Sequence, residues 1–357
     1  MGINLDTQAT RSTLMSVDST LSEAITASQD YIPIASTTNF STSVVAEIET
    51  TNEVVSFTDI SENQFEYSEQ FDNAYWAKWN GSISANAGVA PDGTTTADKA
   101  IPSTANHAFH GFYKPITATD KISSVYAKPD GYDFLTLIHQ ATSTTSIGVQ
   151  FNVSTGVVTY SNGASGTITD AGDGWYRCSI IPDATATDHV LANISDGGAP
   201  NTSQYYYQPA WTPDGTSGML LWGFQLEDDA TLSTYLPTTS AALVGLTGVT
   251  RGANGTTAQS ASSSDSIQQL PYALSEVNMP TRLKGLSVTS DGTGAGRLTL
   301  CDKVGTTLCD VDLPDNRLYE LSWDGGIIFP NGIYVANSDN ITAYTLYTDK
   351  HSGAGVS

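Results

Sequence analysis

Short turn motifs interrupt this chain at close intervals, and they limit the folds open to it more than any other feature. From about residue 65 to residue 238, runs such as SSVYAKPDGYDFLTLIHQ, SIGVQFNVSTGVVTYSNG and GWYRCSIIP contain or border DG, NG and STG turns. Apolar and polar residues alternate along many of these runs, as they do in strands with one buried face. Turns at this spacing are typical of an antiparallel β-sandwich, which we therefore expect here.

Strand-like runs continue on both sides of this region, so we predict an all-β protein. The chain has 357 residues, which is too long for one ordinary core and favours two or three domains. We expect a discontinuous β domain made of residues 1–64 and 239–275, a sandwich at 65–238, and a small β-sandwich module at 276–357.

One short helix is expected near the N-terminus. In STLMSVDSTLSEAITAS, residues 12–28, the apolar residues Leu14, Val17, Leu21 and Ala24 or Ile25 recur at helical spacing. The narrow apolar stripe predicts a helix that packs against another subunit.

The charge balance excludes some classes of partner. The net charge is −23, although only 14% of the residues are charged. Such a surface repels phosphate groups, so we expect no binding to nucleic acid. No apolar run reaches the length of a membrane span, and we expect neither membrane insertion nor a targeting segment.

The three cysteines do not predict a disulfide scaffold. Cys301 and Cys309 flank the turn in TLCDKVGTTLCDV. The apolar alternation places Cys309 on the core face and turns Cys301 the other way, so a bridge between them is not expected. Cys178 is isolated in the sequence.

Several polar motifs raise the question of catalysis or metal binding. In WGFQLEDDATLSTYLPT, three acids from Glu227 to Asp229 follow an apolar strand, in which we expect Trp222, Phe224 and Leu226 to point inward. Adjacent acids at a strand end do not give the fixed separation that glycoside hydrolysis needs, so we interpret them as a solvated strand end.

The remaining motifs also favour structural interpretations. His107 and His110 in HAFH would face opposite ways on a strand, and Asp170 and Asp173 fit a turn better than a calcium site. DGTGAG at 291–296 predicts a hairpin loop and not a phosphate cradle. We therefore predict no catalytic residue, no cofactor and no metal site.

Four motifs, in order, resemble a domain recurrent in bacteriophage virion proteins. They are FEYSEQFDNAYWAKWNGSISANAGVAPDGTTTADKA, SVYAKPDG, DGWYRCSIIPDA and WGFQLEDDATLSTYLPT, which together span about residues 65–238. That domain is similar to the jelly-roll sandwich of carbohydrate-binding modules and concanavalin-like lectins. Outside it, LTGVTRGANGTTAQS resembles a segment of phage tail and other virion proteins, and the strands after residue 276 resemble small phage β modules.

The resemblance implies a non-enzymatic structural protein of the virion, in the tail, the fibre or the capsid surface. It would be made in the host cytoplasm and displayed on the particle, as a homo-oligomer (a trimer or a ring) with other virion proteins as partners. An alternative is a receptor-binding protein that uses the sandwich to bind a host glycan. A polysaccharide depolymerase ranks third, because no short repeat of a β-helix is present.

Four aromatic residues are the candidate glycan or interface contacts. Tyr205, Tyr206 and Tyr207 are consecutive, so at least one ring must leave the core face, and Trp211 follows closely. Exposed Tyr and Trp rings stack on sugar rings, but they also cover subunit interfaces.

The resemblance also predicts a chain topology. The strand EVVSF at 53–57 and the segment LTGVTRGANGTT at 246–257 would pair in one small β domain, with the sandwich inserted between them.

Overall fold

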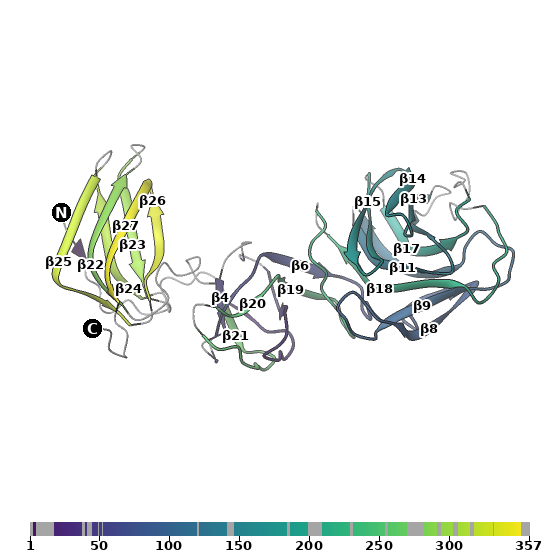
Figure 1. Cartoon of the computed structure of the whole chain (residues 1–357), viewed down its shortest axis with the longest axis horizontal. Helices are drawn as coiled ribbons and strands as arrows, with labels where there is room; N and C mark the ends of the chain where they lie inside the picture. Colours follow the sequence, from purple (N-terminus) through teal and green to yellow (C-terminus); the bar gives the residue numbers. More distant parts are fainter. Residues whose placement is uncertain are drawn as a thin grey trace. The chain divides into compact units, whose positions relative to one another are not determined.

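The computed structural model shows an all-β protein (Figure 1). It describes residues 3–4, 18–37, 40, 45–48, 50–51, 53–119, 121–140, 146–183, 186–198, 209–228, 231–253, 256–269, 281–290, 294–302, 306–314, 318–330 and 332–350. Two compact units are present: residues 61–243 form one, and residues 1–60 together with 244–357 form the other. No helix able to cross a membrane is found in the described part of the chain.

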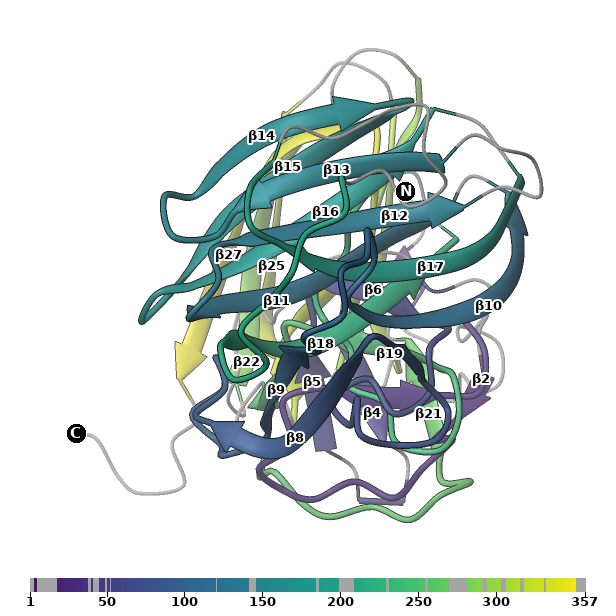
Figure 2. The same cartoon turned by 90° about the vertical axis from the view of Figure 1, so that its right-hand side faces the viewer.

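The 61–243 unit is a sandwich of two six-stranded antiparallel sheets. Sheet 1 contains, in spatial order, β14 (Val157–Asn162), β13 (Ser146–Asn152), β12 (Phe134–Gln140), β17 (Ala186–Ser195), β10 (Gly111–Thr119) and β7 (Ala77–Trp79). Sheet 2 contains β15 (Ala164–Gly172), β16 (Trp175–Pro182), β11 (Ile122–Asp130), β18 (Gly218–Glu227), β9 (Ala97–Pro102) and β8 (Gly81–Gly88). Figure 2 shows β14, β13, β12, β17 and β10 of sheet 1 in this order.

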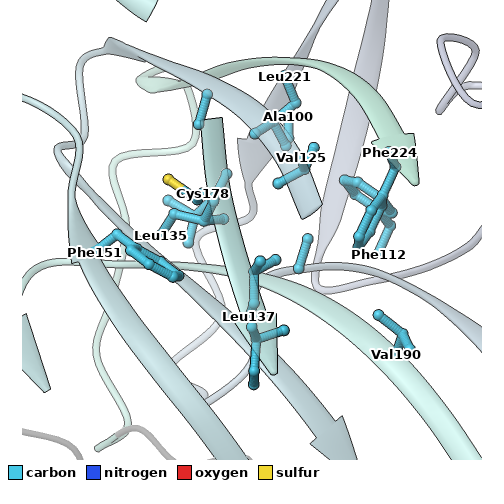
Figure 3. Close-up of a cluster of buried hydrophobic side chains, with 14 of the residues drawn as sticks. Ala100, Phe112, Val125, Leu135, Leu137, Phe151, Cys178, Val190, Leu221 and Phe224 are labelled. Carbon is cyan, nitrogen blue, oxygen red and sulfur yellow. The ribbon is translucent and has the colours of Figure 1, made fainter. Parts of the chain in front are cut away.

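The core of the sandwich lies between the two sheets. Leu135, Leu137 and Phe151 come from sheet 1, and Val125 and Phe224 come from sheet 2, and all five are fully buried (Figure 3). Alternate residues of each strand point away from this core, because side chains alternate faces along a strand. Each sheet therefore has an outer face, on the side opposite this core.

In the other unit, strands from both ends of the chain combine. A five-stranded sheet contains β2 (Asp18–Thr20), β21 (Ser266–Gln269), β4 (Val45–Ile48), β5 (Glu53–Ser56) and β20 (Thr250–Ala253), in this order. A three-stranded sheet contains β3 (Ile32–Ile34), β19 (Leu243–Thr247) and β6 (Asp59–Asn63). The pairing predicted between 53–57 and 246–257 is present, since β5 and β20 are antiparallel neighbours.

The C-terminal strands, together with β1 (Ile3–Asn4) near the N-terminus, form a second sandwich. One sheet contains β1, β24 (Thr307–Leu313), β23 (Gly296–Cys301) and β26 (Tyr334–Asp339); the other contains β25 (Leu318–Phe329), β22 (Thr281–Ser290) and β27 (Ile341–Lys350). Leu286, Leu300 and Val311 belong to their shared core. That core is separate from the cluster formed by Leu21, Ile48 and Leu246. The division of this unit at residue 276 stays a prediction.

The helix predicted for residues 12–28 is wrong in its described part. Residues 18–20 form β2, Leu21 bridges to Ile34, and Ile25 bridges to Ala261. Leu14 and Val17 lie outside the described residues. Leu21 and Ile25 are four residues apart because both anchor the chain in one core. The Ser and Thr residues of the 12–28 segment have only a weak preference for helix.

Two further details of the sequence interpretation are settled here. Cys301 and Cys309 are free thiols in different clusters, as their opposite faces predict. The segment 291–296, however, is not a hairpin loop, because β22 and β23 belong to different sheets. Alternating glycines indicate a turn, but they do not reveal which strand the chain joins next.

Candidate functional site

The outer face of sheet 2 is covered by the chain itself. Trp175 and Trp222 lie on this face with Tyr126 and Tyr235. The Trp175 indole N–H donates to the Val89 carbonyl at 3.1 Å, and the Trp222 indole N–H donates to Thr96 Oγ1 at 3.0 Å. Both tryptophans therefore hold the turn between β8 and β9 against the sheet.

The position of Trp222 corrects the predicted alternation. Phe224 and Leu226 point into the main core, but Trp222 belongs to the outer cluster. Gly223 between Trp222 and Phe224 has a φ of 63°, and the register of β11 and β18 shifts at this point. A bulge inserts one residue and reverses which face the following residues occupy.

The interpretation of Glu227 as part of a solvated strand end is also wrong. Its side chain is buried and accepts hydrogen bonds from the Ser233 amide, at 3.2 Å, and from the Ser233 hydroxyl. Burial raises the pKa of Glu227, and the Ser233 and Gln225 hydrogen bonds and the Arg177 charge oppose this shift. Asp228 is exposed, as expected, and Asp229 lies outside the described residues.

The segment after Glu227 folds back over sheet 2. Arg177 donates to the Ser233 carbonyl at 2.7 Å, and the Leu236 amide donates to Gln225 Oε1 at 2.7 Å. Asn63 Nδ2 donates to the carbonyls of Phe224 and Leu236. All four motifs that resemble the phage domain contribute residues to this covered face. Their polar side chains there form hydrogen bonds within the chain.

The outer face of sheet 1 is built differently, from a polar row. Gln150, Thr136 and Asn193 lie in register across β13, β12 and β17, and each is almost fully buried. Asn193 Oδ1 accepts from the His110 amide at 2.9 Å, and its Nδ2 donates to the Ala108 carbonyl at 3.1 Å. The row thus fixes the loop that leads into β10.

Aromatic rings line the β7 edge of this same face. We call Trp79, Phe109, Tyr113 and His189 the aromatic strip. Successive ring centroids are 6.3, 6.4 and 5.7 Å apart. Trp79 is 42% exposed and also lies 5.3 Å from the His107 ring. The strip therefore offers a flat ring to solvent beside buried hydrogen-bonding groups.

Trp211 is a poor contact for a ligand, although the sequence nominated it. It is only 9% exposed, and its backbone pairs with His107. Its ring packs edge-on against Tyr132, at 4.9 Å, and against His110, at 5.3 Å. Trp211 Nε1 has no hydrogen-bond partner among the described residues. Tyr205, Tyr206 and Tyr207 lie outside the described residues.

The two histidines of HAFH lie close together and serve the fold. Their ring centroids are 6.4 Å apart. The two ring nitrogens of His110 each lie 3.0 Å from a carbonyl oxygen, of Asn80 and of His107. Among the described residues no group of three His, Cys, Asp or Glu side chains is arranged to hold a metal. Asp170 lies near the end of β15, where it accepts from the Gly172 amide at 2.8 Å, and Asp173 lies in the turn that leads to β16.

A buried serine–histidine pair links the two sheets. Ser123 Oγ and His139 Nε2 are 2.7 Å apart, and both side chains are fully buried. His139 Nδ1 has no partner in the described part of the chain, so the third group that would orient a catalytic imidazole is not supplied there. Burial lowers the pKa of His139 to about 3, which keeps the ring neutral. The pair fits an interior role.

Comparison with known proteins adds no family assignment. None of the family models searched matches the chain, and no curated protein matches it. The geometry itself indicates where a site could lie: sheet 2 is closed by its own chain, and the aromatic strip of sheet 1 carries the exposed ring. Sequence reasoning missed Trp79, although WAKW places two tryptophans three residues apart, which on a strand turns them to opposite faces.

Proposed function

We propose that the chain is a non-enzymatic structural protein of a bacteriophage virion that displays the 61–243 sandwich on the particle. The observation that supports this proposal most strongly is the insertion of the sandwich between two paired strands. The sandwich follows β5 and precedes β20, and these two strands pair with each other. The two ends of the sandwich also meet, because the Gln64 amide donates to the Leu226 carbonyl and the Tyr67 amide donates to the Thr239 carbonyl.

This arrangement suits display, because a domain that closes on itself leaves its host strands undisturbed. The host strands are held together independently. Arg251 and Glu53 form a buried bidentate ion pair, and Thr256 Oγ1 accepts from the Val54 amide at 3.0 Å. The proposal includes self-assembly into a trimer or a ring, with other virion proteins as neighbours.

Purified particles provide the test. Mass spectrometry should find the chain in the particles, and immunogold labelling with antibody against the full chain should mark one fixed location. Native mass spectrometry of the purified chain should show a closed homo-oligomer. A chain that is abundant in the lysate and missing from the particles would overturn the proposal. Release of reducing ends from a polysaccharide would instead favour the depolymerase.

A second candidate function, binding of a host glycan by the sandwich, has one observation in its favour. Trp79 exposes its ring at the edge of sheet 1, at one end of the aromatic strip that also contains Tyr113 and His189, which are both partly exposed. An indole face stacks on the apolar face of a sugar ring. The strong negative charge of the chain favours a neutral glycan over an acidic one.

Glycan-array binding of the full chain tests this candidate. Trp79→Ala should weaken binding at least about tenfold, which corresponds to about 1.4 kcal/mol of lost ring contact. Tyr347→Ala is the matched control, since Tyr347 is 51% exposed on the other unit. Equal binding by wild type and Trp79→Ala would remove the strip from consideration.

A further inference from the structure

Glu69 lies where the two ends of the sandwich chain meet. Tyr235 Oη donates to Glu69 Oε1 at 3.1 Å and lies 2.7 Å from Ser68 Oγ. The Ser68 amide donates to the Thr238 carbonyl at 3.3 Å, and the Thr238 amide donates to Ser68 Oγ at 2.9 Å. We call Ser68, Glu69, Tyr235 and Thr238 the clasp, because they join the entering segment to the leaving segment.

The remaining partners of the clasp are aromatic rings of the sheet 2 outer face. The Tyr235 ring lies 4.7 Å from Trp222 and 5.9 Å from Tyr126. The Phe224 amide donates to the Ser68 carbonyl at 2.9 Å, so the clasp is also tied to β18. The Glu69 side chain is therefore partly buried, and its carboxyl lies beside these rings and hydroxyls.

The charged groups around Glu69 are mainly acidic. Asp92 and Asp98 raise the free energy of its ionised form. Asp98 is itself buried, and it accepts from the Phe71 amide at 2.7 Å and the Asn86 amide at 2.9 Å. Lys78 lies near Asp98, but its ammonium group donates to the Asp72 carbonyl at 2.9 Å and to the Asn73 carbonyl.

We propose that the protonated Glu69 carboxyl locks the clasp and that its ionisation loosens the leaving segment, residues 231–239. A neutral carboxyl fits among the rings. An ionised one adds negative charge beside Asp92 and Asp98 in a partly dehydrated place. The device regulates how firmly the ends of the sandwich are joined, which is a property beyond display itself.

The direction of the pH effect follows from the raised pKa of the Glu69 carboxyl. Burial raises the pKa of Glu69 to about 7, Asp92 and Asp98 add to this shift, and the hydrogen bond from Tyr235 opposes it. A carboxyl whose pKa is raised on folding stabilises the fold fully below its ordinary value of 4.5, and this contribution is lost as the pH rises toward 7. The clasp is therefore tight in acid and loose above neutrality.

Hydrogen exchange of the full chain tests the proposal. Exchange is expressed as protection factors, which removes the intrinsic pH dependence of amide exchange. The amides of Tyr67, Ser68, Leu236 and Thr238 should lose about tenfold protection between about pH 6 and about pH 8. Glu69→Gln, which stays neutral, should keep high protection at both values. Glu320→Gln, an exposed acid of β25, should behave as the wild type.

A second variant keeps the test decisive if Glu69→Gln does not fold. Tyr235→Phe removes a donor to the ionised carboxyl, so the midpoint of the loss should move to higher pH. The proposal is overturned if protection is constant across this range, if Glu69→Gln retains the wild-type pH dependence, or if Tyr235→Phe leaves the midpoint unchanged.

Discussion

The Arg251 guanidinium and the Glu53 carboxylate form two parallel hydrogen bonds of 2.8 Å, although 198 positions separate them in the sequence. Arg251 also donates to the carbonyls of Thr26 and Gln259, while the Gln259 amide donates to Glu53. This pair gives Arg251 a structural role, because it joins three distant parts of one small β domain.

Breaking this pair should destabilise the domain strongly. The side chains of Arg251 and Glu53 are 8% and 0% exposed, so Glu53→Gln leaves an almost buried, uncompensated cation. We expect a loss of about 3–5 kcal/mol in the free energy of unfolding, measured by urea denaturation. The control is Asp312→Asn, at an exposed 3.8 Å pair with Arg297, which should cost under about 1 kcal/mol. Equal losses would show that the buried pair is not a stabilising element.

The same pair predicts acid lability of this domain. Burial alone would raise the pKa of Glu53, but hydrogen bonds from Arg251, Gln259 and Gly252 outweigh it and leave the pKa lowered. Its stabilisation is present above the ordinary value of 4.5 and is lost as the pH falls through the lowered pKa. Urea unfolding at a series of acidic pH values should show this loss in the wild type. Glu53→Gln should lack that part of the pH dependence.

The lowered pKa of His139 predicts a second loss of stability at acidic pH, this time in the sandwich. Its folded pKa of about 3 lies below the ordinary 6.5, so the unfolded chain binds the proton first. The free energy of unfolding should fall by up to about 4–5 kcal/mol as the pH drops from 6.5 toward 3. His139→Gln should not show this fall. The difference between the two chains is the relevant measurement, because Glu69 contributes equally to both. An unchanged pH profile in His139→Gln would contradict the assignment.

Substitution of Gly223 tests the bulge that reverses which face the following side chains of β18 occupy. A Cβ there would meet Tyr126 at 3.0 Å and Tyr235 at 3.1 Å, with a φ of 63°. Gly93 also has a positive φ, of 85°, but no atom lies within 4 Å. Gly93→Ala should therefore cost about 1–2 kcal/mol from the backbone alone, and Gly223→Ala should cost more. Thermal unfolding of both variants compares them, and equal melting temperatures would remove crowding from the account.

Replacement of Trp76 by alanine should lower the stability of the sandwich much more than replacement of Trp79. Trp76 is 1% exposed and stacks on Phe224 with centroids 5.4 Å apart. Trp76→Ala should cost about 3–5 kcal/mol of stability, since it leaves a large cavity. Trp79→Ala should leave the melting temperature nearly unchanged. A large fall in melting temperature for Trp79→Ala would make this ring part of the fold and weaken the glycan candidate.

The sequence predicts the strand content because period-two alternation and turn pairs are local signals. It also predicts the opposed faces of Cys301 and Cys309, for the same reason. Alternation does not predict the facing of side chains beyond Gly223, because this single residue in a left-handed conformation forms a bulge and reverses the faces that the following side chains occupy. The burial of Glu227 depends on a segment that returns over the sheet, which alternation does not encode.

The candidate site is less predictable than the fold. A run of tyrosines suggests exposed rings, yet Trp211 beside that run is buried by the packing of Tyr132 and His110. Trp79 is exposed because it ends the short edge strand β7. Whether a strand lies at the edge of its sheet depends on which strands pair in the tertiary structure, and local sequence patterns do not reveal this.

The most direct test of the central claim, that a self-contained sandwich is inserted into a host β domain, is the NMR spectrum of residues 61–243 expressed alone. The account predicts a dispersed amide spectrum whose peaks overlay those of the same residues in the full chain. Below neutral pH it also predicts slow exchange of amides such as Tyr67 and Leu236, which bond only within this unit. A collapsed, poorly dispersed spectrum would show that the sandwich needs the flanking chain, and the insertion model would fail.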